Sequence, residues 1–327
     1  MEREPSGTSG TLLQQDTLRG ISLMTGAMLL IPLMDIVAKY LTATLPPLEI
    51  AFGRFAFQAI FAFLTAAIGP GLSALKTSRP LPHLLRGLFL AGATVLFFTA
   101  LKYMPVANAI AIFFVEPMIL TALSAIFLKE QVGLRRWLAI FIGLAGAILI
   151  IRPGIAEFGP AAVLPLGTAF LFALYLLLTK RLSGEGSMMS IQFTTGIGGA
   201  LLLGSMAAAA VVFNVEDAIF KAPPLPALGL MAVIGAISFF AHGLIVRAFA
   251  MAPASVLAPF NYLEIVSATI FGYLVFADFP DAITWYGIAI IVGCGLYIAH
   301  RERVNRQEIA QARGSRSGAA ADDDPVA

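Results

Sequence analysis

Ten apolar runs of about 20 residues, joined by short connections, constrain the fold of this chain more than any other feature. A helix of about 20 apolar residues crosses the roughly 30 Å of hydrocarbon in a bilayer. Hydrophobic residues make up 59% of the 327 positions and charged residues 12%, against about 25% charged in an ordinary soluble domain. The sequence therefore predicts an all-α integral membrane protein with ten transmembrane helices, at 18–41, 48–68, 84–101, 105–128, 132–151, 160–179, 189–213, 226–250, 253–276 and 282–299.

The basic residues of the connections indicate how the chain crosses the membrane. Lys and Arg in short connections favour the cytoplasmic side. With a cytoplasmic N-terminus, the inside connections hold most of them, including Lys76, Arg79, Arg86, Lys129, Arg135, Arg136, Lys180, Arg181 and Arg247. We therefore expect a multi-pass protein of the cell inner (plasma) membrane with both termini in the cytoplasm. The polar segments 1–17 and 300–327 cannot bury apolar surface and are expected to be disordered tails.

The second half of the chain repeats the first at a constant offset. The register is set by four pairs of identical residues: Pro105 and Pro253, Glu116 and Glu264, Thr121 and Thr269, and Trp137 and Trp285. We interpret the chain as two five-helix repeats, 18–151 and 160–299. Five is an odd number, so the two repeats enter the membrane in opposite directions. Such inverted repeats are typical of secondary transporters, whose site lies near the bilayer midplane between the repeats.

The first half closes with "MPVANAIAIFFVEPMILTALSAIFLKEQVGLRRWLAIFIGLAGAILIIRPG", and the chain resembles the EamA family of the drug/metabolite transporter superfamily. The most specific part of the resemblance is the Glu-Pro span, followed by a loop acid, Glu130, and then a glycine-rich span. The resemblance extends over 20–300 and implies a transporter of small metabolites without selecting the metabolite. Known members export amino acids or transport riboflavin, S-adenosylmethionine and sugars. The second half departs from the pattern, because it reads "NYLEIVSATIFGYLVFADF" with no proline after the glutamate.

Glu116 and Glu264 lie in the middle of the fourth and ninth spans, where a charge costs about 2.5–3.5 kcal/mol on insertion scales. We expect both to line a pathway, where they bind a polar or cationic part of the substrate or take up a proton. The alternative is that each stays protonated and joins neighbouring helices through a hydrogen bond. Pro117 cannot donate to the Phe113 carbonyl and predicts a kink. Since no proline follows Glu264, we expect a broken helix beside Glu116 alone.

A second group of charges lies towards the outer ends of the first two spans. Asp35 and Lys39 are one helical turn apart, and Arg54 follows in the second span. Asp35 can pair with Lys39 at i, i+4 spacing or with Arg54 across the hairpin. We expect an outer ion pair or gate here, with direct substrate contact as the alternative.

Further residues of the spans are candidates for the same pathway. Asn261 and Tyr262 lie one turn before Glu264, and Tyr175 lies in the sixth span. Phe113 and Phe114 precede Glu116 and can offer stacking surfaces, although lipid or core packing is the commoner use of phenylalanine. His242 lies in an apolar run of the eighth span, where a proton role competes with simple packing.

The sequence also limits the class of function. It has no GxxxxGK[ST] loop for ATP hydrolysis, and its three scattered histidines and one cysteine suit neither a hydrolase nor a metal site. We predict no enzyme, no catalytic residue, no cofactor and no metal. We predict a secondary active transporter of small organic metabolites (amino-acid-like, riboflavin-like or S-adenosylmethionine-like), working by alternating access through a central cavity, with proton coupling left open. The alternatives are a flippase for lipids or amphiphiles and a non-transporting membrane sensor or assembly protein. The expected partners are a small-molecule substrate and the lipid bilayer, without nucleic acid, and the protein is a monomer or homodimer.

Overall fold

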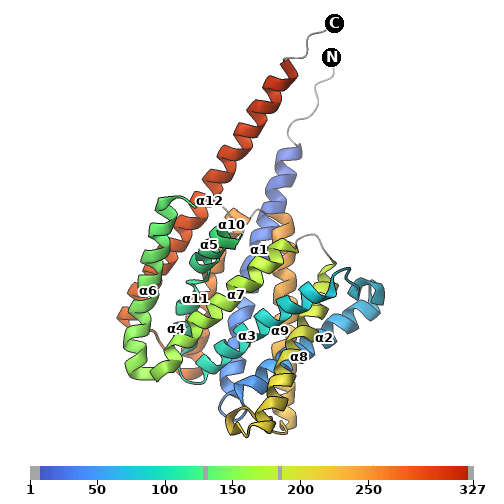
Figure 1. The fold of residues 1–327 in the computed structure, drawn as a ribbon, viewed down its shortest axis with the longest axis vertical. Helices are drawn as coiled ribbons and strands as arrows, with labels where there is room; N and C mark the ends of the chain where they lie inside the picture. Colours follow the sequence, from blue (N-terminus) through green and yellow to red (C-terminus); the bar gives the residue numbers. More distant parts are fainter. Residues whose placement is uncertain (1–7, 128–131, 183–185, 253, 323–327) are drawn as a thin grey trace.

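The computed structural model describes residues 8–127, 132–182, 186–252 and 254–322, and within these ranges it holds helices and no strand (Figure 1). Short 3-10 turns occupy Leu72–Leu75, Gly159–Val163 and Glu216–Ala218. The α-helices are α1 (Thr8–Leu41), α2 (Pro47–Ile68), α3 (Pro80–Leu101), α4 (Val106–Phe113), α5 (Glu116–Phe127), α6 (Leu134–Phe158), α7 (Leu164–Arg181), α8 (Met188–Val212), α9 (Leu225–Met251), α10 (Ala254–Asn261), α11 (Leu263–Phe276) and α12 (Ala282–Asp322).

Ten segments of these helices are long and apolar enough to cross a membrane, which confirms the predicted all-helical membrane class. Two spans consist of paired short helices, α4 with α5 and α10 with α11. The end of α1 at Thr8 and the end of α12 at Asp322 point to the same end of the bundle (Figure 1). Both terminal helices therefore continue past the span ends expected at 18 and 299. Glu130 and Lys129 lie outside the described residues.

Helices of the first half pack mainly against helices of the second half. α1 contacts α9 and α11, α2 contacts α8 and α9, and α3 contacts α7 and α8. α5 packs on α7, while α6 lies beside α12 at one edge of the bundle (Figure 1). These contacts correspond under the repeat, because α1 with α9 is matched by α7 with α3, and α1 with α11 by α7 with α5. The two halves therefore interleave instead of forming separate bundles.

Small residues allow the close approach of α6 and α12. A Cβ atom added to Gly146 on α6 would lie 2.8 Å from Ile290 Cγ2 on α12. A Cβ atom added to Gly287 on α12 would lie 3.0 Å from the Gly146 carbonyl oxygen. Small residues at such crossings let helix backbones approach in a membrane, where packing rather than water exclusion drives association.

Both glutamate-bearing spans are interrupted, so the expectation of a broken helix beside Glu116 alone is wrong. α4 ends at Phe113 and α5 begins at Glu116, while α10 ends at Asn261 and α11 begins at Leu263. Tight i to i−3 hydrogen bonds mark each break: Val115 N–H donates to Ile112 O at 3.2 Å, and Tyr262 N–H donates to Pro259 O at 3.4 Å. The second break follows Pro259, which lies inside α10 and cannot donate to the preceding turn.

Arg86 was expected in an inside connection, and the structure places it within the bundle instead. Because α3 begins at Pro80, Arg86 lies two turns into the helix and is 1% exposed. Its Nη2 donates to the Ile191 carbonyl at 3.2 Å and to Thr195 Oγ1 at 3.0 Å, both on α8. Arg86 thus joins the two halves of the chain and does not report on membrane orientation.

Candidate functional site

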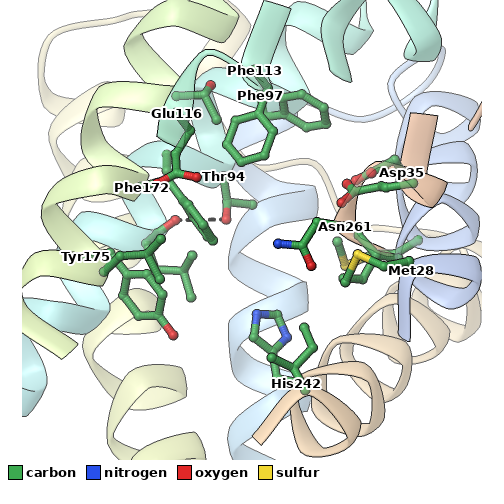
Figure 2. A pocket seen from close by; sticks show the side chains of 18 of the residues that line it. Met28, Asp35, Thr94, Phe97, Phe113, Glu116, Phe172, Tyr175, His242 and Asn261 are labelled. Carbon is green, nitrogen blue, oxygen red and sulfur yellow. Dashed lines mark hydrogen bonds between the residues drawn. The ribbon is translucent and has the colours of Figure 1, made fainter. Parts of the chain in front are cut away.

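A cavity of about 270 Å³ lies between helices of the two halves, and we call it the central cavity (Figure 2). Helices α1 to α5 of the first half and α7, α9, α10 and α11 of the second contribute to its wall. The lining side chains are Met24, Met28, Ile31, Met34, Asp35, Arg54, Leu90, Ala93, Thr94, Phe97, Phe98, Phe113, Phe114, Glu116, Thr168, Phe172, Tyr175, Leu176, His242, Ile245, Phe249, Asn261 and Glu264.

Three carboxyl groups line this mainly apolar space: Asp35 on α1, Glu116 on α5 and Glu264 on α11. Glu116 is 8% exposed, and its Oε1 has no hydrogen-bond partner among the described residues. The same holds for Oδ1 of Asn261. Buried oxygens without a partner are rare in folded proteins, because each forfeits its hydration. These two oxygens therefore mark a place where a ligand donor would be favourable.

The helix breaks explain why two of the acids reach the cavity. Glu116 is the first residue of α5, and Glu264 is the second residue of α11. The first turn of a helix has free N–H groups and a partial positive charge, which favours a carboxyl group there. Each break thus puts a helix N-terminus and an acid together in the interior of the bundle. Pro117 follows in the first turn of α5, where its missing N–H leaves no lost bond.

Arg54 on α2 is the cationic counterpart of these acids and is 4% exposed. Its Nη1 donates to Thr94 Oγ1 and its Nε to Ser238 Oγ at 3.1 Å. A chain of neutral groups continues from there. Ser238 donates to Gln58 Oε1 at 3.1 Å, and Gln58 Nε2 donates to Gln192 Oε1 at 3.2 Å.

His242 on α9 lines the same cavity (Figure 2). Its Nδ1 lies 2.8 Å from the backbone oxygen of Ser238 one turn earlier. Because a carbonyl oxygen only accepts, Nδ1 bears the hydrogen, and Nε2 of a neutral ring is left as an acceptor. His242 is thus a lining group with a helix-bonded ring rather than a buried packing residue.

Aromatic rings form one wall of the cavity (Figure 2). The ring of Phe172 packs against Tyr175 at 5.3 Å and against Phe113 at 5.4 Å between centroids. Phe113 in turn packs against Phe97 at 6.1 Å and Phe114 at 5.9 Å. Such a row offers stacking surface for a planar, aromatic or cationic part of a ligand.

Three of the predicted residues lie elsewhere. Tyr262 packs its ring on Phe114 at 5.1 Å between centroids and is not among the lining residues. Its hydroxyl lies against Gly295 of α12, where no side chain would fit. Pro117, at the start of α5, is also not among the lining residues. Lys39 lies one helical turn beyond Asp35, the last lining residue of α1.

The prediction that Asp35 forms an ion pair is wrong, because neither proposed partner binds it. Lys39 Nζ lies 2.5 Å from Oδ2 of Asp278, in the connection between α11 and α12, and 3.3 Å from the Met104 carbonyl. Arg54 bonds hydroxyl groups, as described above. Within the described ranges Asp35 forms no ion pair, and it lines the cavity instead. Tertiary packing of α1 on α11 brings Asp278 to Lys39 in place of the helical neighbour.

Sequence reasoning missed part of the wall. Thr94, Thr168, Phe97 and Phe172 line the cavity, as do the methionines of α1. A repeat of Met24 and Met28 at four-residue spacing marks one helix face, but a core face gives the same pattern. The two phenylalanines are among 25 in the chain, so the sequence offered no signal that separates them from packing residues.

The three acids do not come together as a metal site. In the part of the chain that the structure describes, no group of three or more His, Cys, Asp or Glu side chains is placed to hold a metal ion. The three acids come from three different helices of the cavity wall, α1, α5 and α11.

Comparison with known proteins gives matches to a family profile, to individual relatives and to a solved structure. The sequence fits the profile described as the EamA-like transporter family twice, over residues 18–152 and 159–299. It is 32% identical over 269 residues to the S-adenosylmethionine uptake transporter of Rickettsia bellii, a match that covers 82% of this chain and 89% of that protein. It is 29% identical over 279 residues to the riboflavin transporter of Rhizobium johnstonii, covering 83% and 87%. One solved crystal structure has a TM-score of 0.59 at 20% identity, over 88% of this chain and 97% of that one, a likeness of fold alone.

Proposed function

Because this chain belongs to the EamA-like transporter family, we propose that it is a secondary active transporter that moves small organic metabolites by alternating access through the central cavity. The observation that supports this most is the composition of the cavity wall, to which both repeats contribute acids and aromatic rings. Its volume of about 270 Å³ is close to the lower end of the roughly 300–1,000 Å³ typical of small-molecule sites.

The two repeats are inverted in this proposal, and both termini are on the cytoplasmic side of the inner membrane. The correspondence of contacts supports the inversion, because α1 with α9 and α7 with α3 are the same contact seen from each repeat. The two helix breaks, each beside a glutamate, support it as well. In an inverted arrangement the breaks approach the midplane from opposite sides, which is where transporters of this construction place their substrate.

The substrate class that we propose is a cationic metabolite with a planar aromatic part, of which S-adenosylmethionine is the example among the relatives. Asp35, Glu116 and Glu264 favour a positive charge, and the row from Tyr175 to Phe113 favours a ring. Riboflavin offers the ring without a cation. A flippase is the less favoured alternative, since the lining groups come from helices of both halves.

Counterflow in proteoliposomes tests this function. Proteoliposomes that contain the purified protein are loaded with S-adenosylmethionine. Riboflavin, amino acids and nucleosides are then tested as competitors of its counterflow. We expect S-adenosylmethionine and related cations to compete best. Glu116→Gln and Glu264→Gln should each lower the counterflow rate at least tenfold, since each removes a carboxyl group that lines the cavity. Tyr262→Phe is a matched control outside the cavity wall. Wild-type rates in both glutamate variants, or best competition by a neutral nucleoside, would contradict the proposal.

A further inference from the structure

We infer that Arg54 is the specificity-determining residue that binds a carboxylate of the substrate, so that the cavity selects zwitterions over simple cations. This deepens the transport function proposed above and rests on it. The inference starts from a buried charge that makes no direct ion pair among the described residues. Arg54 is 4% exposed, and no carboxyl group of the described residues lies within ion-pair distance of it. Asp35 acts on Arg54 electrostatically but makes no direct ion pair with it, so the guanidinium has lost its water without gaining a carboxylate bonded to its N–H groups.

The hydrogen bonds of Arg54 hold the side chain in place without neutralising it. A guanidinium has five N–H donors, and the described residues accept from two, through Thr94 Oγ1 and Ser238 Oγ. Both acceptors are hydroxyl groups. The chain beyond Ser238 consists of the amides of Gln58 and Gln192, which are also neutral. Three donors, including both on Nη2, thus remain for another acceptor.

The geometry of a guanidinium fits a carboxylate in particular. Two parallel N–H groups can each meet one carboxylate oxygen, and this bidentate pair is among the strongest hydrogen-bonded arrangements in proteins. Because Arg54 lines the central cavity, a ligand there can reach the free donors. The polar chain spans α2, α8 and α9, so Arg54 is fixed in advance and loses little freedom on binding.

Other groups of the cavity complete a site for opposite charges. Asp35 is the acid that could compensate Arg54, yet it forms no ion pair with it in the described part of the chain. The unpartnered oxygens of Glu116 and Asn261 belong to a different part of the wall, on α5 and α10. The cavity therefore offers donors to an anion from α2 and acceptors to a cation from α5 and α10. A ligand that has both charges satisfies both sets.

Arg86 provides a natural comparison. It is also a buried arginine, at 1% exposed, but it does not line the cavity. Its guanidinium donates to the Ile191 carbonyl and to Thr195 and lies 5.9 Å from the ring centroid of Tyr175. Arg86 serves the contact between α3 and α8, whereas Arg54, which also lies 4.8 Å from a ring centroid, that of Phe55, lines the cavity.

Matched ligands that differ by one carboxylate test the inference. Equilibrium binding to purified protein in lipid nanodiscs is measured for S-adenosylmethionine and its decarboxylated form, and for arginine and its decarboxylated amine, agmatine. We expect wild-type protein to bind the carboxylate member of at least one pair about 10- to 100-fold more tightly, as for hydrogen bonds between charged groups. Arg54→Gln should abolish this preference while it still binds the decarboxylated member, which shows that the variant is folded. Arg54→Lys should retain part of the preference, because it keeps the charge without the planar pair of donors.

Arg86→Gln is the control for loss of a buried arginine, and it should keep the wild-type ratio between the members of each pair. An unchanged preference in Arg54→Gln would overturn the role of Arg54. If wild-type protein binds or transports these cations without preference within any pair, the role of Arg54 fails while the proposed transport function stands. If it binds and transports no member of either pair, the role of Arg54 and the proposed cationic substrate class both fail.

Discussion

The ion pair between Lys39 and Asp278 is expected to keep one end of the central cavity closed. It joins α1 to the connection between α11 and α12, one turn beyond Asp35, the last lining residue of α1. The two side chains are 18% and 28% exposed, and their charged atoms are 2.5 Å apart. Lys39 also bonds the Met104 carbonyl and lies 4.8 Å from the ring centroid of Phe276. All of these contacts lie at the end of the bundle away from the chain termini (Figure 1).

The size of the effect follows from this geometry. An exposed ion pair contributes about 0.2–1 kcal/mol. A hydrogen bond to a charged group contributes about 1.5–3 kcal/mol, and the low exposure of Lys39 and Asp278 places their pair in that range. Since 1.4 kcal/mol is a factor of ten, loss of the pair should shift the equilibrium between closed and open forms of this end by about 10- to 150-fold. Loss of the ion pair should therefore leave this end of the cavity open for a larger fraction of the time.

Chemical labelling measures that shift. A cysteine replaces Met34 in the cavity wall, in a Cys294→Ser background, and a membrane-impermeant maleimide is added from the side away from the termini. Lys39→Gln and Asp278→Asn should each raise the labelling rate at least tenfold, and the double variant should raise it no further, because both remove the same bond. Lys102→Gln is the matched control, a lysine of the neighbouring connection that packs on a tyrosine ring instead of forming an ion pair. Labelling rates equal to this control, or fully additive effects, would refute the reasoning.

Three further outcomes are expected. Gly146→Leu should lower the stability of the protein by about 1–3 kcal/mol, since the leucine side chain would overlap Ile290. Thermal unfolding in detergent measures this loss, and an unchanged Tm would argue against close packing of α6 on α12. Phe172→Ala should weaken substrate binding about 3- to 10-fold, because it removes the middle ring of the aromatic wall, and titration of the nanodisc protein measures this. Tyr262→Phe should leave the substrate Kd unchanged, since its hydroxyl faces Gly295 and not the cavity; a loss of more than threefold would show that the lining is assigned wrongly.

The features that a local pattern or an internal comparison can reveal were predictable from the sequence. The apolar runs gave the spans, and the family match over both halves confirms the repeat. Glu116 and Glu264 were found because a carboxyl group in a hydrocarbon span is conspicuous. The break before Glu264 was missed because the two halves place their proline differently. Pro259 precedes Glu264 in the second half, whereas Pro117 follows Glu116 in the first. Both halves have a proline near the glutamate, but its position relative to the glutamate differs.

The remaining differences come from contacts between distant parts of the chain. Lys39 has an acid one turn away on its own helix, yet it pairs with Asp278, far along the sequence. Arg86 was assigned to a connection because charged residues near the end of an apolar run usually lie there. Arg86 lies at the very start of the predicted span 84–101, and because the helix begins at Pro80 it is an interior residue and not part of a connection. No local signal distinguishes these cases, because burial in this bundle is decided by the other half.

The interleaving of the halves also has a consequence for how the protein is made. Translation delivers α1 to α6 into the membrane before their main partners α7, α8, α9, α11 and α12 exist. At that stage Arg54 lacks Ser238, Gln58 lacks Gln192, and Arg86 has no bond to α8. Until the second half is inserted, polar side chains of the early spans therefore lack hydrogen-bond partners, and each such group is costly in lipid. Insertion of the second half completes every one of these contacts, so the biogenesis of this protein is decided late, by its last spans.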